Sequence, residues 1–227
     1  MSIFRTVDLA CPACDSPVSF ELVYSVSADR RPDLRAAILD ASFQREPCPA
    51  CGKPFRVDPE FSYMDIARGQ YIGVWPVSSR SEWRACAAKT QEVYEQTLGA
   101  RATPEAKELG RRLEPRVVFG WPALVEKILA KQAGIDDRTL EVAKVAVMRS
   151  GEEAPLPGAE EFRLVGEKDG DFVLAWVSLG GDQQTGTVKV PRKLIADIEA
   201  APETWKALRA DIAEGLVVDF QRELLAA

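Results

Sequence analysis

The chain has 227 residues, 46% of them hydrophobic, which is enough to bury a core and excludes a wholly disordered chain. Its formal net charge of −6, from 29 basic and 35 acidic residues, disfavours electrostatic binding to nucleic acid. Histidine is absent, so neither a histidine general base nor an imidazole metal ligand is available.

The first part of the chain has the pattern of a β-rich region. Residues 17–28 alternate between apolar and polar, which predicts a strand with Phe20 and Tyr24 on the same face. Pro32 lies near the first turn of a predicted short helix. The expected elements are a strand over 2–10, a strand over 17–28, a helix over 31–40 and a strand over 41–47.

From Ser79 the apolar residues recur at helical spacing. Ser79 and Glu82 match a capping box, which predicts a helix that starts there and stops at Gly99. Thr103 and Pro104 predict the start of a second helix. A third helix follows the segment PRVVFG, and a fourth, capped by Asp136 or Asp137, extends to about Met148.

The stretch 150–161, SGEEAPLPGAEE, has the acidic, Pro- and Gly-rich composition of a linker. Beyond it we expect a hairpin that turns at Asp169–Gly170, a third strand and short helices. The sequence therefore predicts an α+β fold with a zinc-ribbon-containing β region, then helices, over 1–149. A smaller α+β module over 162–227 follows the linker.

Two near copies of one motif carry the main functional signal. CPACD contains Cys11 and Cys14, and CPACG contains Cys48 and Cys51. In such a turn proline fixes the first bend, and the residue after the second cysteine favours positive φ, which Gly52 adopts freely and Asp15 tolerates. Two of these knuckles predict a zinc ribbon with four thiolate ligands: Cys11, Cys14, Cys48 and Cys51.

Three alternatives to structural Zn²⁺ are compatible with the cysteine pattern. An iron site of the rubredoxin type uses the same four ligands, a redox-active dithiol needs exposed thiols of low pKa, and two unrelated turns need no metal. Four thiolates leave no open coordination position, which disfavours catalytic zinc. The fifth cysteine, Cys86, lies on the apolar stripe of a predicted helix, and we interpret it as a buried apolar residue.

Together with a later segment, the cysteine motifs resemble the bacterial CpXC family, which is named for two C-P-x-C motifs. The resemblance covers about residues 5–150, and the family is functionally uncharacterised. It implies a metal-binding ribbon joined to helices and supplies no reaction. Outside the cysteines it rests on Val118–Phe119–Gly120, Leu124, Glu126–Lys127, Gly134–Ile135–Asp136–Asp137–Arg138, Glu141 and Lys144.

Within that segment, Asp136, Asp137 and Glu141 have two interpretations. They can form a carboxylate site, or the aspartates can cap a helix, where acidic charge favours the positive end of the dipole. We favour capping.

The start MSIFRTVDLA lacks a long apolar signal region, and no apolar run approaches the roughly 20 residues that span a bilayer. We therefore expect a cytoplasmic protein with no membrane association. Its leading function is a non-enzymatic module in which zinc holds a surface for a protein partner. The alternatives are a nucleic-acid-associated zinc ribbon and an enzyme whose site lies away from the zinc.

Overall fold

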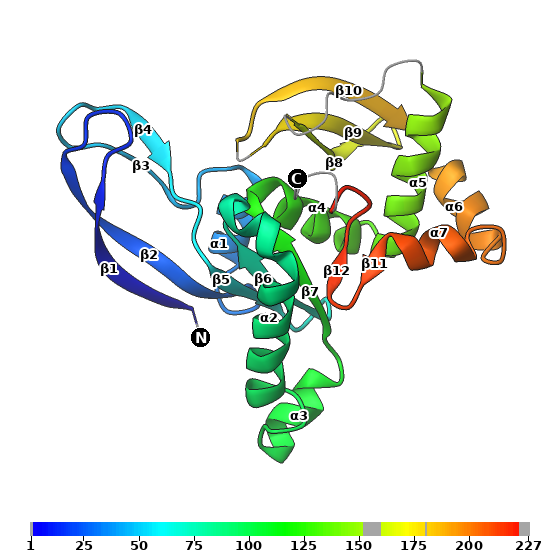
Figure 1. Ribbon diagram of the computed structural model, residues 1–227, viewed down its shortest axis with the longest axis horizontal. Helices are drawn as coiled ribbons and strands as arrows, with labels where there is room; N and C mark the ends of the chain where they lie inside the picture. Colours follow the sequence, from blue (N-terminus) through cyan, green and yellow to red (C-terminus); the bar gives the residue numbers. More distant parts are fainter. Residues whose placement is uncertain (1, 152–159, 180, 223–227) are drawn as a thin grey trace.

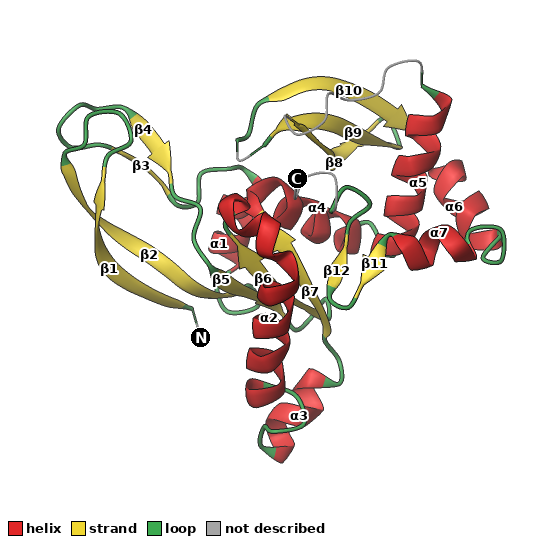
Figure 2. Ribbon diagram, viewed as in Figure 1, coloured by secondary structure: helices red, strands yellow, loops and turns green. Residues whose placement is uncertain are grey.

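The structure is a computed structural model that describes residues 2–151, 160–179 and 181–222. Figure 1 shows a protruding arm, a central body and a C-terminal sheet with its own helices. In Figure 2 the arm is built of strands and loops, whereas helices gather around the body.

The strands are β1 Ile3–Ala10, β2 Pro17–Ser27, β3 Arg45–Pro47, β4 Pro54–Arg56, β5 Phe61–Asp65, β6 Gln70–Trp75, β7 Glu114–Phe119, β8 Glu160–Lys168, β9 Asp171–Ser178, β10 Gln184–Val190, β11 Ala213–Glu214 and β12 Val217–Val218. The helices are α1 Pro32–Leu39, the 3₁₀ helix η1 Val77–Glu82, α2 Trp83–Thr97, α3 Pro104–Gly110, α4 Gly120–Gln132, α5 Asp137–Ser150, α6 Arg192–Ala200 and α7 Lys206–Asp211.

The central sheet has five strands in the order β1-β2-β5-β6-β7. The pairs β1–β2 and β5–β6 are antiparallel, and β2–β5 and β6–β7 are parallel. All six residues of β6 are buried, as expected for a strand covered on both faces. Two smaller antiparallel hairpins, β3–β4 and β11–β12, lie outside this sheet.

One face of the sheet packs against α1 and α4. Ile38, Leu124 and Ile128 of the helices are fully buried there against apolar residues of β2, β5 and β6. Trp121 lies in the same core, where its ring centroid is 5.3 Å from that of Phe61. Its Nε1 donates a hydrogen bond of 3.0 Å to the backbone oxygen of Val57. Helix α4 is thereby tied to the loop that leaves β4.

The opposite face packs against α2 at a position that requires glycine. A Cβ on Gly73 would lie 2.5 Å from the Oγ1 of Thr90, so a larger residue would push the helix away. The close approach lets Trp75 Nε1 donate a 3.0 Å hydrogen bond to that hydroxyl. Trp83 and Cys86 of α2 are buried in this second core.

The expected strand over 17–28 is present as β2, and the buried side changes along it: Val18 and Phe20 are buried near the knuckles, whereas Val23 and Val26 are buried nearer the body and Tyr24 is 38% exposed. One local expectation was wrong. Residue Ser79 makes no side-chain cap, since the 3₁₀ turn η1 precedes α2. The physical reason lies in Arg80, which is buried in that turn and donates to Glu161 at 2.9 Å.

The three-stranded sheet has the order β10-β9-β8 and the predicted hairpin turn, with positive φ at Asp169 and Gly170. Its apolar residues share a core with α5, in which Leu140 and Phe162 are buried. Of the predicted linker 150–161, residues 152–159 lie outside the described residues, and the last two belong to β8.

The protein therefore has the expected α+β class, with cysteine-bearing strands, then helices, then a three-stranded sheet with helices. The helices in the described ranges are all too short or too polar to cross a bilayer.

Candidate metal centre

The four predicted ligands meet at the far end of the arm. Cys11 and Cys14 lie in the turn between β1 and β2, and Cys48 and Cys51 lie in the turn between β3 and β4, which face each other in Figure 1. Their Sγ atoms all lie within 4.8 Å of one another. More than thirty residues separate the two cysteine pairs in the sequence. The long β1–β2 hairpin and the short β3–β4 hairpin bring them together by placing their turns side by side.

The two turns have the same backbone hydrogen bonds. Cys11 N donates to Ser16 O and Asp15 N donates to Cys11 O, both at 2.9 Å. The second turn repeats both bonds. Cys48 N donates to the carbonyl oxygen five residues further along the chain at 2.9 Å, and Gly52 N donates to Cys48 O at 2.8 Å. The expected positive φ is present in both turns, 56° at Asp15 and 73° at Gly52.

The distances between sulfur atoms fit a metal site. The Sγ atoms of Cys11 and Cys51 are 3.9 Å apart, and those of Cys14 and Cys48 are 3.7 Å apart. A disulfide needs about 2.05 Å. Four thiolates bound tetrahedrally at about 2.3 Å from an ion would lie about 3.8 Å from one another. Two of the distances therefore match a tetrahedral metal site, and the others stay within 4.8 Å.

Hydrogen bonds in the turns favour thiolate at some of these positions. The hydroxyl and the backbone of Ser16 lower the pKa of the Cys14 thiol to about 6. A hydrogen bond from the backbone of Cys51 lowers the pKa of Cys48. At Cys51 a backbone hydrogen bond from Lys53 also favours the thiolate, but burial and the neighbouring thiols outweigh it and raise the pKa to about 11. Four negative sulfurs at this spacing repel one another, so full ionisation requires a bound cation.

Cys86 is not part of this site. It lies on the buried side of α2, in the same core as Trp83, and its Sγ contacts the backbone oxygen of Ser79 at 3.8 Å. Burial raises the pKa of its thiol, which keeps it protonated and unreactive. The interpretation of Cys86 as an apolar core residue is confirmed.

The fold and the site define a class of protein: an α+β body that carries two C-P-x-C knuckles on an arm, arranged as a candidate four-cysteine metal site. The family model described as CpXC protein matches residues 9–144, which is more than half of the chain, and the chain belongs to that family. No curated protein and no solved structure matches it.

The aspartates of the IDDR segment have two separate roles. Asp136 caps α5, as expected, and accepts a 3.0 Å hydrogen bond from Thr139 N. Asp137, whose side chain is 11% exposed, instead belongs to an ion-pair cluster, 2.7 Å from Arg116 Nε and 3.0 Å from Lys127 Nζ. Burial opposes its ionisation, but the two cations outweigh burial and hold the pKa of Asp137 well below its usual range.

A buried charge network was missed by the sequence reasoning. Lys144 Nζ is fully buried and lies 2.7 Å from Glu126 and 2.8 Å from Glu141. The same Glu126 contacts Arg163 of β8 at 3.0 Å, and Arg163 contacts Asp219 at 2.7 Å. These ion pairs tie the helices of the body to the C-terminal segments. The sequence contains a signal for buried ion pairs, because charged residues occupy core-facing positions of two amphipathic helices. Periodicity alone does not identify the oppositely charged residues that face them.

Proposed function

We propose that Cys11, Cys14, Cys48 and Cys51 bind one Zn²⁺ that holds the two knuckles of the arm together. The observation that carries this proposal is the spacing of the sulfur atoms, which is 3.7 and 3.9 Å for two of the pairs and within 4.8 Å for all of them. Zinc with four cysteine ligands is a closed structural site, so we infer a structural and not a catalytic role for the ion. Fe²⁺ or Fe³⁺ would use the same ligands and is the alternative outcome of metal analysis.

Metal analysis of purified single Cys→Ser variants tests the proposal. We expect one zinc per chain in the wild type and in Cys86→Ser, and less than one in each of the four knuckle variants. Cys86→Ser is the matched control because it removes a thiol outside the cluster. Retention of full zinc by Cys11→Ser, or loss of it in Cys86→Ser, contradicts the assignment, and iron in place of zinc changes the identity of the metal.

We further propose that the metal-held arm is an interaction module for a protein partner in the cytoplasm. The supporting feature is β1, which is one of the two edge strands of the five-stranded sheet and has exposed side chains at several positions, among them Ile3 at 46%. An edge strand can pair with an extended segment of another protein through main-chain hydrogen bonds.

The test is an affinity capture from the native cell with nuclease treatment. A lysine on an edge strand opposes strand addition, so Ile3→Lys should lose a partner that the wild type retains. Val188→Lys on β10, an edge strand of the three-stranded sheet, is the matched control. A partner lost on nuclease treatment favours a nucleic-acid-associated ribbon, and a partner retained equally by Ile3→Lys contradicts docking at β1.

A further inference from the structure

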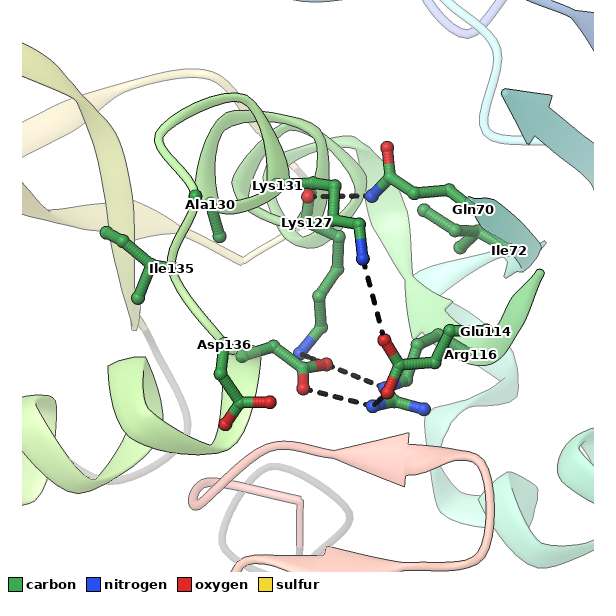
Figure 3. Close-up of a pocket in the computed structure, with 11 residues that line it drawn as sticks. Gln70, Ile72, Glu114, Arg116, Lys127, Ala130, Lys131, Ile135 and Asp136 are labelled. Carbon is green, nitrogen blue, oxygen red and sulfur yellow. Dashed lines mark hydrogen bonds and ion pairs between the residues drawn. The ribbon is translucent and has the colours of Figure 1, made fainter. Parts of the chain in front are cut away.

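A second site candidate lies away from the cysteines, between β6, β7 and α4. It is a cavity of about 310 Å³, bounded on its third side by the turn from α4 into α5 (Figure 3). Pockets for small ligands generally have about 300–1,000 Å³, so this one has room for one small molecule. Ile72, Ala130 and Ile135 form an apolar part of its wall.

Hydrogen-bond acceptors gather on the strand side of the cavity. Gln70 of β6 and Glu114 of β7 are cross-strand partners in the parallel ladder. Gln70 is 94% buried and donates Nε2 to the backbone oxygen of Lys127 at 2.9 Å. That carbonyl can only accept, which fixes the orientation of the amide and leaves the buried Oε1 without a partner among the described residues. Gln70 therefore closes this end of the cavity, and Glu114, whose side chain is 49% exposed, is the acceptor on the strand side that a ligand can reach.

Cations occupy the helix side of the same cavity. Lys127 and Lys131 both project from α4, and Figure 3 shows Lys131 directed across the cavity towards Glu114. The distance from Lys131 Nζ to Glu114 Oε2 is 3.8 Å, and the two side chains are 38% and 49% exposed. A long and exposed ion pair of this kind contributes little, so its partners can separate at low cost.

We propose that this cavity binds a free α-amino acid with an aliphatic side chain, which inserts between Lys131 and Glu114. The ammonium group donates to the Glu114 carboxylate. The carboxylate of the ligand accepts from Lys131 Nζ, and the aliphatic side chain contacts the apolar wall. Both partners of the opened ion pair keep an opposite charge.

Calorimetric titration with L-leucine, L-isoleucine and L-valine tests the proposal, together with two analogues of leucine. 4-Methylpentanoate lacks the ammonium group and isopentylamine lacks the carboxylate. We expect at least one of the amino acids to bind, and the two leucine analogues to bind roughly ten- to one-hundredfold more weakly than L-leucine, as expected for loss of a hydrogen bond to a charged group. Absence of binding by all three amino acids, or equal binding of the carboxylate analogue, overturns the proposal.

Variants locate the binding. Glu114→Gln and Lys131→Met should each weaken binding by a similar factor. Lys131→Met should leave the melting temperature unchanged because its side chain is partly exposed, whereas Glu114→Gln should lower it because Glu114 also pairs with the largely buried Arg116. The matched control is Lys189→Met, which breaks another exposed pair, with Asp169, at 2.8 Å and should bind like the wild type. Unchanged affinity in both cavity variants would contradict this location. The zinc content of all variants should stay the same, so this test is independent of the metal proposal.

Discussion

Single backbone positions shape the metal knuckles. Gly52 and Asp15 follow the second cysteine of each turn, and both have positive φ. An L-residue pays about 1–2 kcal/mol in this region, less for Asp or Asn, whose short polar side chains hydrogen-bond locally. A Cβ on Gly52 would meet no atom within 4 Å, so any cost of substitution there comes from the backbone alone.

Gly52→Asp copies the first knuckle and should therefore be milder than Gly52→Val. We expect the valine variant to destabilise the zinc-bound turn by about 1–2 kcal/mol, because a β-branched residue fits positive φ poorly. Competition with a chromophoric zinc chelator measures both variants against the wild type. Equal zinc affinity of the two variants would show that φ at this position does not limit metal binding.

Asp137 should make the free energy of unfolding depend on pH, and the sign of this dependence follows from its lowered pKa. Its stabilising contribution is present well above the unfolded-state value near 3.8 and is lost as the pH falls towards the folded-state value. Asp137→Asn leaves Arg116 and Lys127 without this partner and should cost about 3–5 kcal/mol near pH 7. The difference in unfolding free energy between wild type and variant should shrink in acid.

Urea unfolding from pH 7 down to pH 3 measures that difference. Zinc is also lost in acid, but this affects both proteins and cancels in the comparison. Asp169→Asn, which removes an exposed carboxylate paired with Lys189, is the control and should show a small effect at every pH. A constant difference between Asp137→Asn and wild type would contradict the lowered pKa.

At the scale of elements, the β3–β4 hairpin is held at both ends. Its tip belongs to the cysteine cluster, and at its base Arg45 and Arg56 are cross-strand partners that both contact Asp182 before β10. Arg56 also lies 4.3 Å above the Trp121 ring and donates to Phe43 O at 3.0 Å. The base is thus anchored to the body, whereas the tip has little apolar support apart from Val18 and Phe55.

Removal of the metal should therefore unfold the arm and spare the body. The core contacts of Val23, Ile38 and Phe43 hold the chain between the knuckles in the body, so we expect loss of order only over residues of about 8–20 and 46–55. Hydrogen exchange with and without a strong chelator should show faster exchange in these two segments only. Unchanged protection of both knuckles in verified metal-free protein would show that the ion is not structural.

Some elements could be predicted from sequence because their determinants are local. Thr103 caps α3 by accepting from Ala106 N at 3.4 Å, and Asp136 caps α5 in the same way. The start of α2 was placed wrongly because a distant residue, Glu161, attracts Arg80 and tightens the turn. A capping box describes only neighbouring residues and cannot report such a contact.

At the scale of the whole molecule, the acidic balance predicts weak binding to generic DNA or RNA. The net charge of −6 offers no electrostatic gain on a polyanion. The cations Arg116, Lys127, Lys144 and Arg163 are moreover buried in ion pairs and do not form a basic surface. Gel-shift titrations near physiological salt should show weak binding, and salt-sensitive binding below micromolar concentration would favour the nucleic-acid alternative.

The sequence by itself determined the candidate metal ligands, the conformation of both knuckles and most helix boundaries. These depend on bonds and hydrogen bonds between residues a few positions apart, which a motif records directly. Only the tertiary structure decided the sheet order, the burial of Glu126, Lys144 and Arg163, and the cavity between Gln70, Glu114 and Lys131. Each of these depends on which distant segment faces a given side chain. The sequence of a helix shows that a residue is charged, but it does not show which residue of another segment pairs with it.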